Sequence, residues 1–238
     1  MNSAPKLAIF DLDNTLLMGD SDYLWGQFLV ERGLVDGPSY ASENRHYYEA
    51  YKAGTLDIRE FLRFSLRPLR DNDPAVLKSW RQQFMADKIL PIIPAASREL
   101  LRLHRARGDE LLIITATNRF VTEPVAVEFE VPHLLATEPE VIDGRYTGEI
   151  SGTACFQHGK VERLEEWLVQ RGVAYASRWF YSDSHNDLPL LRKVDYPVAV
   201  DPDDELRRVA IEHNWPIASL RSESGQAVFA RATGKTGG

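Results

Sequence analysis

The stretch KLAIFDLDNTLL, residues 6–17, decides the fold. Its apolar run at residues 7–10 has the length of a buried parallel strand. Asp11 and Asp13 follow at once, and because side chains alternate along a strand we expect both carboxylates to leave on the same side. Asp11 stands at the carboxyl end of this strand, the edge of an open α/β sheet where ligands bind. Two carboxylates so close need a cation or a shared proton, which indicates a metal site, an acid/base pair, or both.

The same residues also have a simpler explanation. Asp and Asn are frequent in turns and helix caps, so Asp13-Asn14-Thr15 after a strand could form only a turn. A short motif identifies a functional site only in the right structural context. The rest of the chain has to supply that context.

The composition is that of an ordinary globular protein, and it argues against one class of function. The chain has 238 residues, of which 44% are hydrophobic and 26% charged, enough for one domain or one domain with an insertion. Its net charge of −7 argues against nucleic-acid binding, because nucleic-acid-binding domains are normally basic. An acidic protein that handles an anionic substrate needs a metal ion or placed Lys and Arg side chains.

Other features of the sequence bear on where the protein works. No apolar run reaches the roughly 18 residues of a membrane-spanning helix, and residues 1–13 show no signal peptide. The single cysteine, Cys155, excludes an intrachain disulfide and favours a reducing compartment. We interpret Cys155 as a small packed residue. We therefore expect a cytoplasmic protein with no membrane partner.

A helical region follows the first strand. Apolar residues recur at helical spacing in four segments, and Asp73-Pro74 is typical of a helix start. The segments cover residues 21–33, 40–53 and 57–67, and a fourth from residue 73. None of them resembles a strand. The pattern predicts a four-helix cap over residues 18–90.

From residue 91 the pattern alternates between strands and helices. Apolar runs at residues 110–114, 134–136, 178–181, 197–200 and 216–220 predict strands, separated by helices at 95–107, 118–128, 159–172 and 202–213. Asp143-Gly144 indicates a hairpin. This alternation predicts an α/β fold with a doubly wound, mostly parallel sheet, built from residues 1–17 and 91–221. Residues 222–238 are small and polar, and we expect a flexible tail.

Polar residues of a particular kind collect at one edge of this sheet. They follow three predicted strands, and a lysine opens a helix: Asp11 and Asp13, Thr115, Lys160, and Asp183 with Asp187. A phosphoryl group needs cations and hydrogen-bond donors around its oxygens, which Lys and Thr provide. Magnesium prefers one or two carboxylates among hard oxygen ligands. A carboxylate can also attack phosphorus, and a second carboxyl group nearby can protonate the leaving oxygen.

This set of residues resembles the haloacid dehalogenase superfamily. The motifs Asp11-Leu-Asp13-Asn-Thr15 and Asp183-Ser-His-Asn-Asp187 are specific, whereas Thr115 and Lys160 alone are weak signals. The spacing, the helical insertion and the ending YSDSHNDLPLL resemble the phosphoserine phosphatase-like branch, which also includes bacterial histidinol-phosphatases. The resemblance covers the chain to about residue 221. It implies a Rossmann-like core with a C1-type helical cap.

The resemblance also implies a role for each matching residue. It assigns the nucleophile to Asp11, the acid/base to Asp13, phosphoryl binding to Thr115, Lys160 and Asn186, and Mg²⁺ to Asp11, Asp13 through its main-chain carbonyl, and Asp183, with Asp187 alongside. The implied activity is magnesium-dependent hydrolysis of a small phosphorylated metabolite through an aspartyl-phosphate. We interpret His185 as a neighbour of the site, because Asp13 already fills the role of the base.

Departures from the family pattern narrow the choice of substrate. Phosphoserine phosphatases usually have Ser-Gly-Gly where this chain has Thr115-Ala116-Thr117, so phosphoserine itself is in question. Asp20 corresponds to an acidic residue that binds the substrate amine in that branch, and it could equally be the N-cap of the next helix. Arg45, Arg59, Arg63 and Arg67 are candidates to hold a substrate carboxylate, or they are solvated. We therefore favour an aminoalkyl phosphate, with histidinol phosphate ahead of phosphoserine.

Two other functions fit the same residues. A phosphotransferase or mutase would use the same core if the cap kept water from the aspartyl-phosphate. A silent binding module would keep the fold, but the presence of every core residue argues against it. A dehalogenase is disfavoured, because a halide needs no proton from Asp13.

Overall fold

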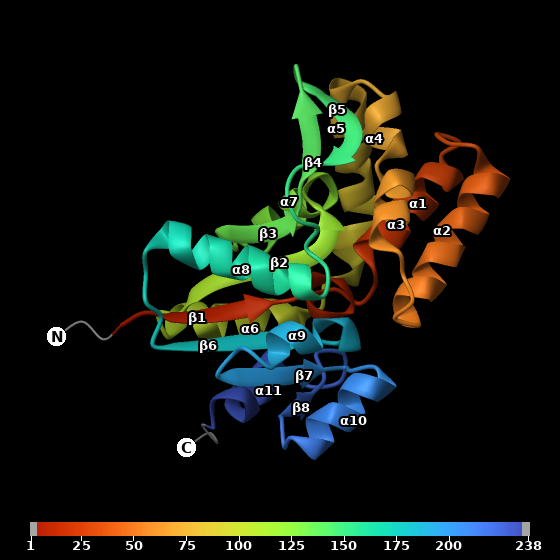
Figure 1. Ribbon diagram of the computed structural model, residues 1–238. Helices are drawn as coiled ribbons and strands as arrows, with labels where there is room; N and C mark the ends of the chain where they lie inside the picture. The colour runs from red at the N-terminus through yellow and green to blue at the C-terminus, as the bar shows by residue number, and fades with distance from the viewer. Residues whose placement is uncertain (1–3, 235–238) are drawn as a thin grey trace.

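The computed structural model describes residues 4–234 and is organised around one parallel sheet (Figure 1). The six strands are arranged in the order β3-β2-β1-β6-β7-β8, and every neighbouring pair is parallel. The strands are β1 (Lys6–Phe10), β2 (Glu110–Asn118), β3 (His133–Thr137), β6 (Ser177–Ser182), β7 (Tyr196–Val200) and β8 (Ile217–Ala218). The doubly wound α/β fold predicted from the sequence is confirmed, with β1 in the interior of the sheet.

The sheet is buried on both faces, which explains the continuous apolar runs in its strands. Leu7 and Ile9 of β1 pack on one side, and Ala8 and Phe10 pack on the other. The first side is covered by α8 (His158–Arg171), α9 (Leu188–Leu191) and α10 (Asp204–Glu212). The second side is covered by α6 (Ala95–Ala106), α7 (Arg119–Glu128) and α11 (Gly225–Thr233).

The chain between β1 and β2 contains only helices among its regular elements. They are α1 (Ser21–Glu31), α2 (Gly37–Lys52), α3 (Ile58–Ser65), α4 (Arg67–Asp71) and α5 (Pro74–Phe84), followed by short turns of helix at Met85–Ile89 and Leu90–Ile92. The predicted third helix corresponds to α3, and α4 is an additional short helix that the sequence did not predict; Pro68 lies in its first turn, where the missing N–H has no intrahelical partner to lose. Trp25 and Phe28 of this cap pack on Phe84, and Trp25 also packs on Phe120 of α7, which joins cap and core.

A hairpin projects from the core toward the cap. It consists of β4 (Pro139–Ile142) and β5 (Arg145–Ile150), and its turn is Asp143-Gly144 as predicted, with φ of 50° and 77°. β5 lies against α3 and α4 of the cap. Gly148 has a φ of 90°, in the left-handed region that favours glycine, and a Cβ there would also lie 3.1 Å from Cδ of Arg70.

The C-terminal region differs from the expected flexible tail. Gly225–Thr233 form α11, which lies along α6. A Cβ on Gly225 would lie 2.4 Å from the carbonyl oxygen of Ala96, so the small residue permits close contact between the two helices. The indole N–H of Trp179 donates to the carbonyl of Ala232 at 3.2 Å. Small residues therefore mark helix packing here; the rest of the predicted tail, residues 235–238, lies outside the described part of the chain.

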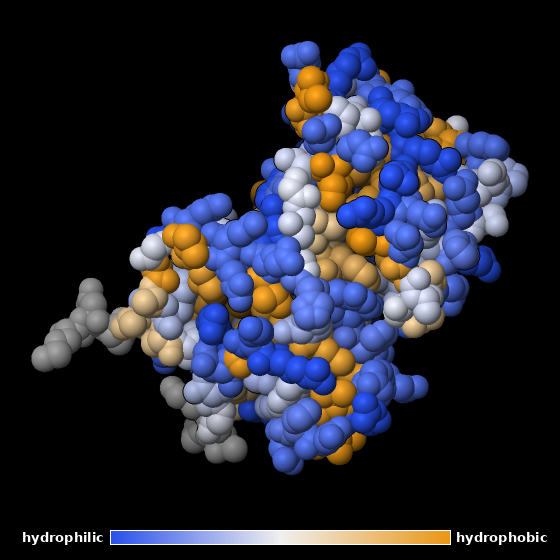
Figure 2. Space-filling model, in the orientation of Figure 1, coloured by the Kyte–Doolittle hydropathy of each residue, from blue (hydrophilic) through white to orange (hydrophobic). Residues whose placement is uncertain are grey.

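No helix within residues 4–234 combines the length and apolarity needed to cross a membrane. Hydrophobic residues on the face shown in Figure 2 gather in the recess where the cap meets the core. Hydrophilic residues cover most of the remaining visible face.

Candidate active site

Asp11 occupies the predicted position at the carboxyl end of β1, but the route to Asp13 differs from the prediction. The chain leaves the strand after Asp11 and forms a wide turn, Leu12–Leu16, in which Asn14 has a φ of 56°. Strand alternation therefore does not orient Asp13. Both carboxylates nevertheless line the same cavity, with Asp11 3% and Asp13 8% exposed. The turn, and not the strand pleat, brings them together.

Lys160 links two of the predicted carboxylates. Its Nζ donates to Oδ1 of Asp11 at 2.8 Å and lies 2.7 Å from Oδ1 of Asp187. Asp187 also accepts from the hydroxyl of Ser182 at 2.7 Å. Burial by itself would lower the pKa of Lys160, but Asp11 and Asp187 outweigh it and raise that pKa. Lys160 is therefore a fixed positive charge beside Asp11.

The loop before Lys160 is tightly folded. Gln157 has a φ of 48°, in the left-handed region. A Cβ on Gly159 would lie 2.0 Å from the carbonyl oxygen of Ala154, so only glycine fits there. This close approach of the backbone sets where α8 begins and thereby where Lys160 enters the site.

Thr15 connects Asp11 with Asp183. Its hydroxyl lies 3.0 Å from Oδ1 of Asp183 and 3.4 Å from Oδ2 of Asp11. The main-chain N–H of Asp183 donates to the same hydroxyl at 3.0 Å. Burial, then the neighbouring carboxylates, raise the pKa of Asp183 well above its usual range. Burial likewise raises the pKa of Asp11 to about 7, with Lys160 acting in the opposite direction.

Asp13 is held by donors from two elements. The main-chain N–H of Ser21 donates to Oδ1 at 2.7 Å, and the hydroxyl of Thr117 donates to Oδ2 at 2.8 Å. The hydroxyl of Thr115 lies 3.4 Å from the same oxygen. β2 continues past Ile114, where the sequence predicted its end, and so carries both threonines. Thr117 is not among the site residues predicted from the sequence, although its spacing of two from Thr115 places both on one face of a strand.

Two residues of the last motif contact the cap and not a site carboxylate. The side chain of Asn186 accepts from Gln157 at 3.0 Å and donates to the carbonyl of Tyr51 at 3.2 Å. His185 binds Asp203 at 2.7 Å and lies so close to Gly54 that a Cβ there would be 2.6 Å from its Nε2. His185 is thus a neighbour of the site, and Asn186 spans core and cap.

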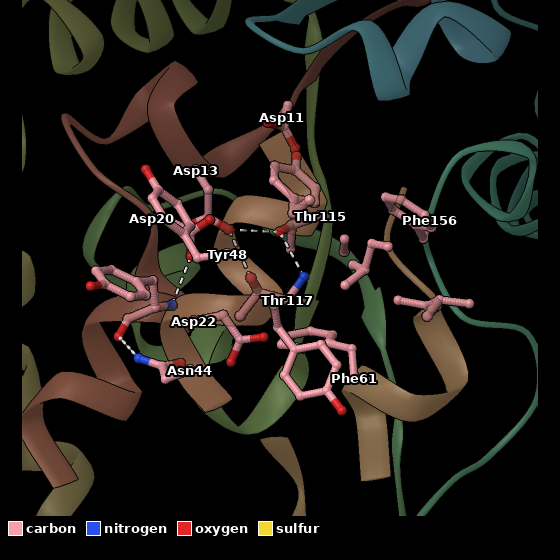
Figure 3. A pocket seen from close by; sticks show the side chains of 16 residues that line it. Asp11, Asp13, Asp20, Asp22, Asn44, Tyr48, Phe61, Thr115, Thr117 and Phe156 are labelled. Atoms are coloured by element: carbon pink, nitrogen blue, oxygen red, sulfur yellow. Dashed lines mark hydrogen bonds between the residues drawn. The ribbon is translucent and has the colours of Figure 1, made fainter. Parts of the chain in front are cut away.

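Asp20 lies both at the N-cap of a helix and in the lining of the cavity, the two positions that the sequence left open. It is the N-cap of α1, since its Oδ1 accepts the N–H of Tyr23 at 2.8 Å. It also lines the cavity that contains Asp11 and Asp13 (Figure 3). Burial, followed by the charge of Asp13, raises the pKa of Asp20 well above its usual range.

The cavity lies between cap and core and encloses about 550 Å³, part of it open to solvent. Catalytic-side residues from the turn after β1 and from β2 line one end, and cap residues line the other. The lining residues are Asp11, Asp13, Asp20, Asp22, Tyr23, Asn44, Tyr47, Tyr48, Tyr51, Leu56, Ile58, Phe61, Thr115, Ala116, Thr117 and Phe156. Among these described residues there is no Lys or Arg, so Arg45, Arg59, Arg63 and Arg67 do not line it.

The donor set suits a magnesium ion. Asp11 and Asp183 are joined through Thr15, and each has a raised pKa because burial and nearby carboxylates disfavour its ionised form. A divalent cation would relieve this repulsion. In residues 4–234 no three His, Cys, Asp or Glu side chains are grouped to hold a metal by themselves. Two carboxylates with a main-chain carbonyl and waters are nevertheless typical of magnesium.

The sequence matches one protein family over most of its length. Residues 8–192 match the haloacid dehalogenase-like hydrolases. A histidinol-phosphatase of Neisseria meningitidis serogroup C (strain 8013) is 45% identical over 220 residues, covering 91% of this chain and 99% of that protein. A phosphoserine phosphatase of Mycobacterium tuberculosis (strain ATCC 25618 / H37Rv) is 29% identical over 217 residues, covering 90% and 70%.

Solved structures show the same fold. A protein of unknown function from Bordetella pertussis Tohama I has a TM-score of 0.87 and 42% identity, covering 92% of this chain and 100% of that one. A phospho-aspartyl intermediate analogue of phosphoserine phosphatase has a TM-score of 0.69 at 16% identity, covering 95% and 98%. The second likeness concerns the fold alone.

Proposed function

The chain belongs to the haloacid dehalogenase-like hydrolase family, and we propose that it is a magnesium-dependent phosphatase that hydrolyses histidinol phosphate through an aspartyl-phosphate. One observation carries the proposal. At a single sheet edge, Asp11 is paired with Lys160 while Asp13 is held by Thr117 and Ser21. In this proposal Asp11 is the nucleophile and Asp13 is the acid/base, and each carboxylate is held by different partners.

In the proposed first step, Asp11 attacks phosphorus. A bond forms between an Asp11 carboxylate oxygen and phosphorus, and the bond from phosphorus to the ester oxygen breaks. Asp13 gives its proton to the departing alkoxide, so an alcohol leaves. Lys160 stays positively charged beside Asp11 and balances the phosphoryl oxygens. Thr115 adds a donor at the same edge.

In the second step, the ionised Asp13 takes a proton from water. The resulting hydroxide attacks phosphorus and the bond to Asp11 breaks, which releases inorganic phosphate and restores both carboxyl groups. Asp11 and Asp183, with the main-chain carbonyl of Asp13, would hold Mg²⁺. The ion would neutralise charge on the phosphoryl oxygens. Asp187 contacts Lys160 and Ser182, and we propose that it fixes Lys160 in place.

Asp20 is proposed to bind the amine of the substrate. Its Oδ1 caps α1, and the carboxylate faces the same cavity as Asp13. The cavity lining offers no described Lys or Arg to a substrate carboxylate, which supports histidinol phosphate over phosphoserine. The 45% identity to a histidinol-phosphatase supports the same choice.

The test compares three esters in the presence of Mg²⁺: histidinol phosphate, phosphoserine and a des-amino analogue of histidinol phosphate. We expect the highest kcat/KM for histidinol phosphate. Asp20→Asn should then penalise the two amine-bearing esters by about 1–3 kcal/mol, the scale of a lost charged hydrogen bond. Equal losses on all three esters would leave Asp20 only a helix cap. Faster hydrolysis of phosphoserine would contradict the proposed substrate.

A further inference from the structure

The cap end of the cavity is aromatic. Tyr47, Tyr48 and Tyr51 reach it from α2, Phe61 comes from α3, and Phe156 comes from the loop before α8. The rings of Tyr48 and Tyr23 stack with their centroids 4.4 Å apart. Aromatic faces attract flat rings and cations, so this end favours a planar or positively charged group over an aliphatic one.

Asp22 is the unusual residue in these surroundings. It lies in the first turn of α1, two residues after the cap residue Asp20. Figure 3 shows its carboxylate between Asn44 and Phe61, at the cap end of the cavity. Within residues 4–234 its carboxylate has no hydrogen-bond or ion-pair partner, whereas the carboxylate of Asp20 accepts the main-chain N–H of Tyr23.

No cationic side chain among residues 4–234 pairs with the carboxylate of Asp22. The amide of Asn44 is directed at the carbonyl of Tyr23, 3.0 Å away, and the described cavity lining contains no Lys or Arg. Burial, followed by the negative charge of Asp13, raises the pKa of Asp22 to about 7. Asp22 is only partly exposed, and a carboxylate partly shielded from water without a partner is unfavourable, so a partner from outside the chain would stabilise it.

We propose that Asp22 is a specificity residue that pairs with a nitrogen-bearing aromatic ring of the substrate, while Asp20 takes the amine. The inference rests on the proposed phosphatase function and refines its substrate. The substrate class is a phosphate monoester of an amino alcohol that carries a basic heteroaromatic ring. A ring N–H donates to the Asp22 carboxylate, and the tyrosines enclose the ring faces.

The same residue would select against competing esters. Phosphoserine carries a carboxylate where the ring would be, and Asp22 would repel it. Specificity would then come from one attractive and one repulsive effect of a single side chain. Removing the charge of Asp22 should therefore change the ratio between substrates, and not the rate of the chemical step.

The experiment uses the full chain with Mg²⁺ and measures kcat and KM for three esters. They are histidinol phosphate, which carries both ring and amine; phosphoethanolamine, which carries only the amine; and phosphoserine. The variants are Asp22→Asn and Asp20→Asn, with Glu49→Gln as the matched control. Glu49→Gln removes the same charge from α2, but the side chain of Glu49 is 63% exposed and does not line the cavity.

Asp22→Asn should lower the ratio of kcat/KM for histidinol phosphate over phosphoethanolamine by about 10- to 100-fold, mainly through KM, as for a lost charged hydrogen bond. It should also raise kcat/KM for phosphoserine relative to kcat/KM for phosphoethanolamine. Asp20→Asn should lower kcat/KM for all three amine-bearing esters together, and Glu49→Gln should leave both ratios within about two-fold. Circular dichroism checks that each variant is folded.

Two kinds of failure are distinguishable. A wild-type enzyme that hydrolyses none of these esters, nor p-nitrophenyl phosphate, overturns the proposed function and the inference with it. An active enzyme whose substrate ratios are unchanged in Asp22→Asn, or are changed equally by Glu49→Gln, overturns the inference alone. A higher wild-type kcat/KM for phosphoethanolamine than for histidinol phosphate also overturns the inference alone.

Discussion

The two ends of the cavity differ in how their carboxylates are held. At the core end, Asp13 accepts from Ser21 and Thr117, and Asp11 accepts from Lys160. At the cap end, the carboxylate of Asp22 has no hydrogen-bond or ion-pair partner within the described residues. The protein therefore holds the two carboxylates at the core end but not the one of Asp22.

This difference fits the roles proposed for the two ends. Groups that perform chemistry gain from being oriented before the substrate arrives, and buried hydrogen bonds provide that orientation. A group that selects the substrate gains from having no protein partner, because the ligand then supplies one. The core end lies on strand ends, whereas the cap end lies on helices outside the sheet.

The largest effect is expected from Asp11→Asn. The amide is nearly isosteric but is a poor nucleophile, so kcat should fall by about 10⁴-fold or more while the fold remains. Beryllium fluoride trapping or mass spectrometry of the wild type should place the adduct on Asp11. An adduct on a Ser, Cys or His would contradict the assignment of the core end to nucleophilic catalysis.

Removal of the proposed metal ligand should have the next largest effect. Asp183→Ala should lower kcat/KM at least about 100-fold, because loss of a direct ligand should cost no less than loss of a supporting residue. Excess EDTA should abolish wild-type activity, and added Mg²⁺ should restore it. Asp204→Ala, at an exposed position of α10, is the control. Full activity in EDTA would show that the core end works without a metal.

A smaller effect tests whether orientation of Asp13 matters. Thr117→Val keeps the shape of the side chain but removes its hydrogen bond to Asp13, and kcat should fall about 10- to 100-fold. Thr117→Ser should restore most of the rate. Thr122→Val removes a buried hydroxyl that contacts only the carbonyl of Asn118. An equal loss of kcat in the two valine variants would mean that the effect comes from packing and not from the hydrogen bond to Asp13.

The smallest effect concerns stability at the cap end. The pKa of Asp22 is about 7 in the folded protein, against 3.8 for a free side chain, so the folded state binds more protons between these values. Stability therefore falls as the pH rises from about 4 to 7. Asn cannot ionise, so Asp22→Asn should raise Tm at pH 8 by about 2–4 °C, the change expected for about 1 kcal/mol.

At pH 4.5 the same comparison should show a smaller difference, because Asp22 is then protonated in the folded state. Asp13, Asp20 and Tyr40 are the neighbouring titratable groups, and all are present in both proteins. Thermal denaturation at the two pH values measures the difference. An equal Tm for variant and wild type at pH 8 would mean that Asp22 carries no cost in the free enzyme.

Some features of the site could be predicted from the sequence and others could not. Asp11 was placed correctly because an apolar strand ends before it, whereas Thr117 was missed because β2 was expected to end at Ile114. Asp22 was missed for a different reason. Two residues that are two positions apart within a helix point to nearly opposite sides, so Asp20 and Asp22 would not be expected to face the same cavity. Asp20, however, precedes the helix and has an extended backbone, and both side chains line the cavity.

The α/β fold and the kind of chemistry could be predicted from the sequence alone, because strand period, helix period and the motifs that follow strands are local patterns. Which residues contact one another in the site could be seen only in the folded chain. Lys160 contacts Asp11 across 149 positions, and α11 packs on α6 through Val228 and Phe229 although the region was expected to be a flexible tail. Such contacts depend on how the elements pack, and packing is set by the shapes of distant surfaces that no local period describes.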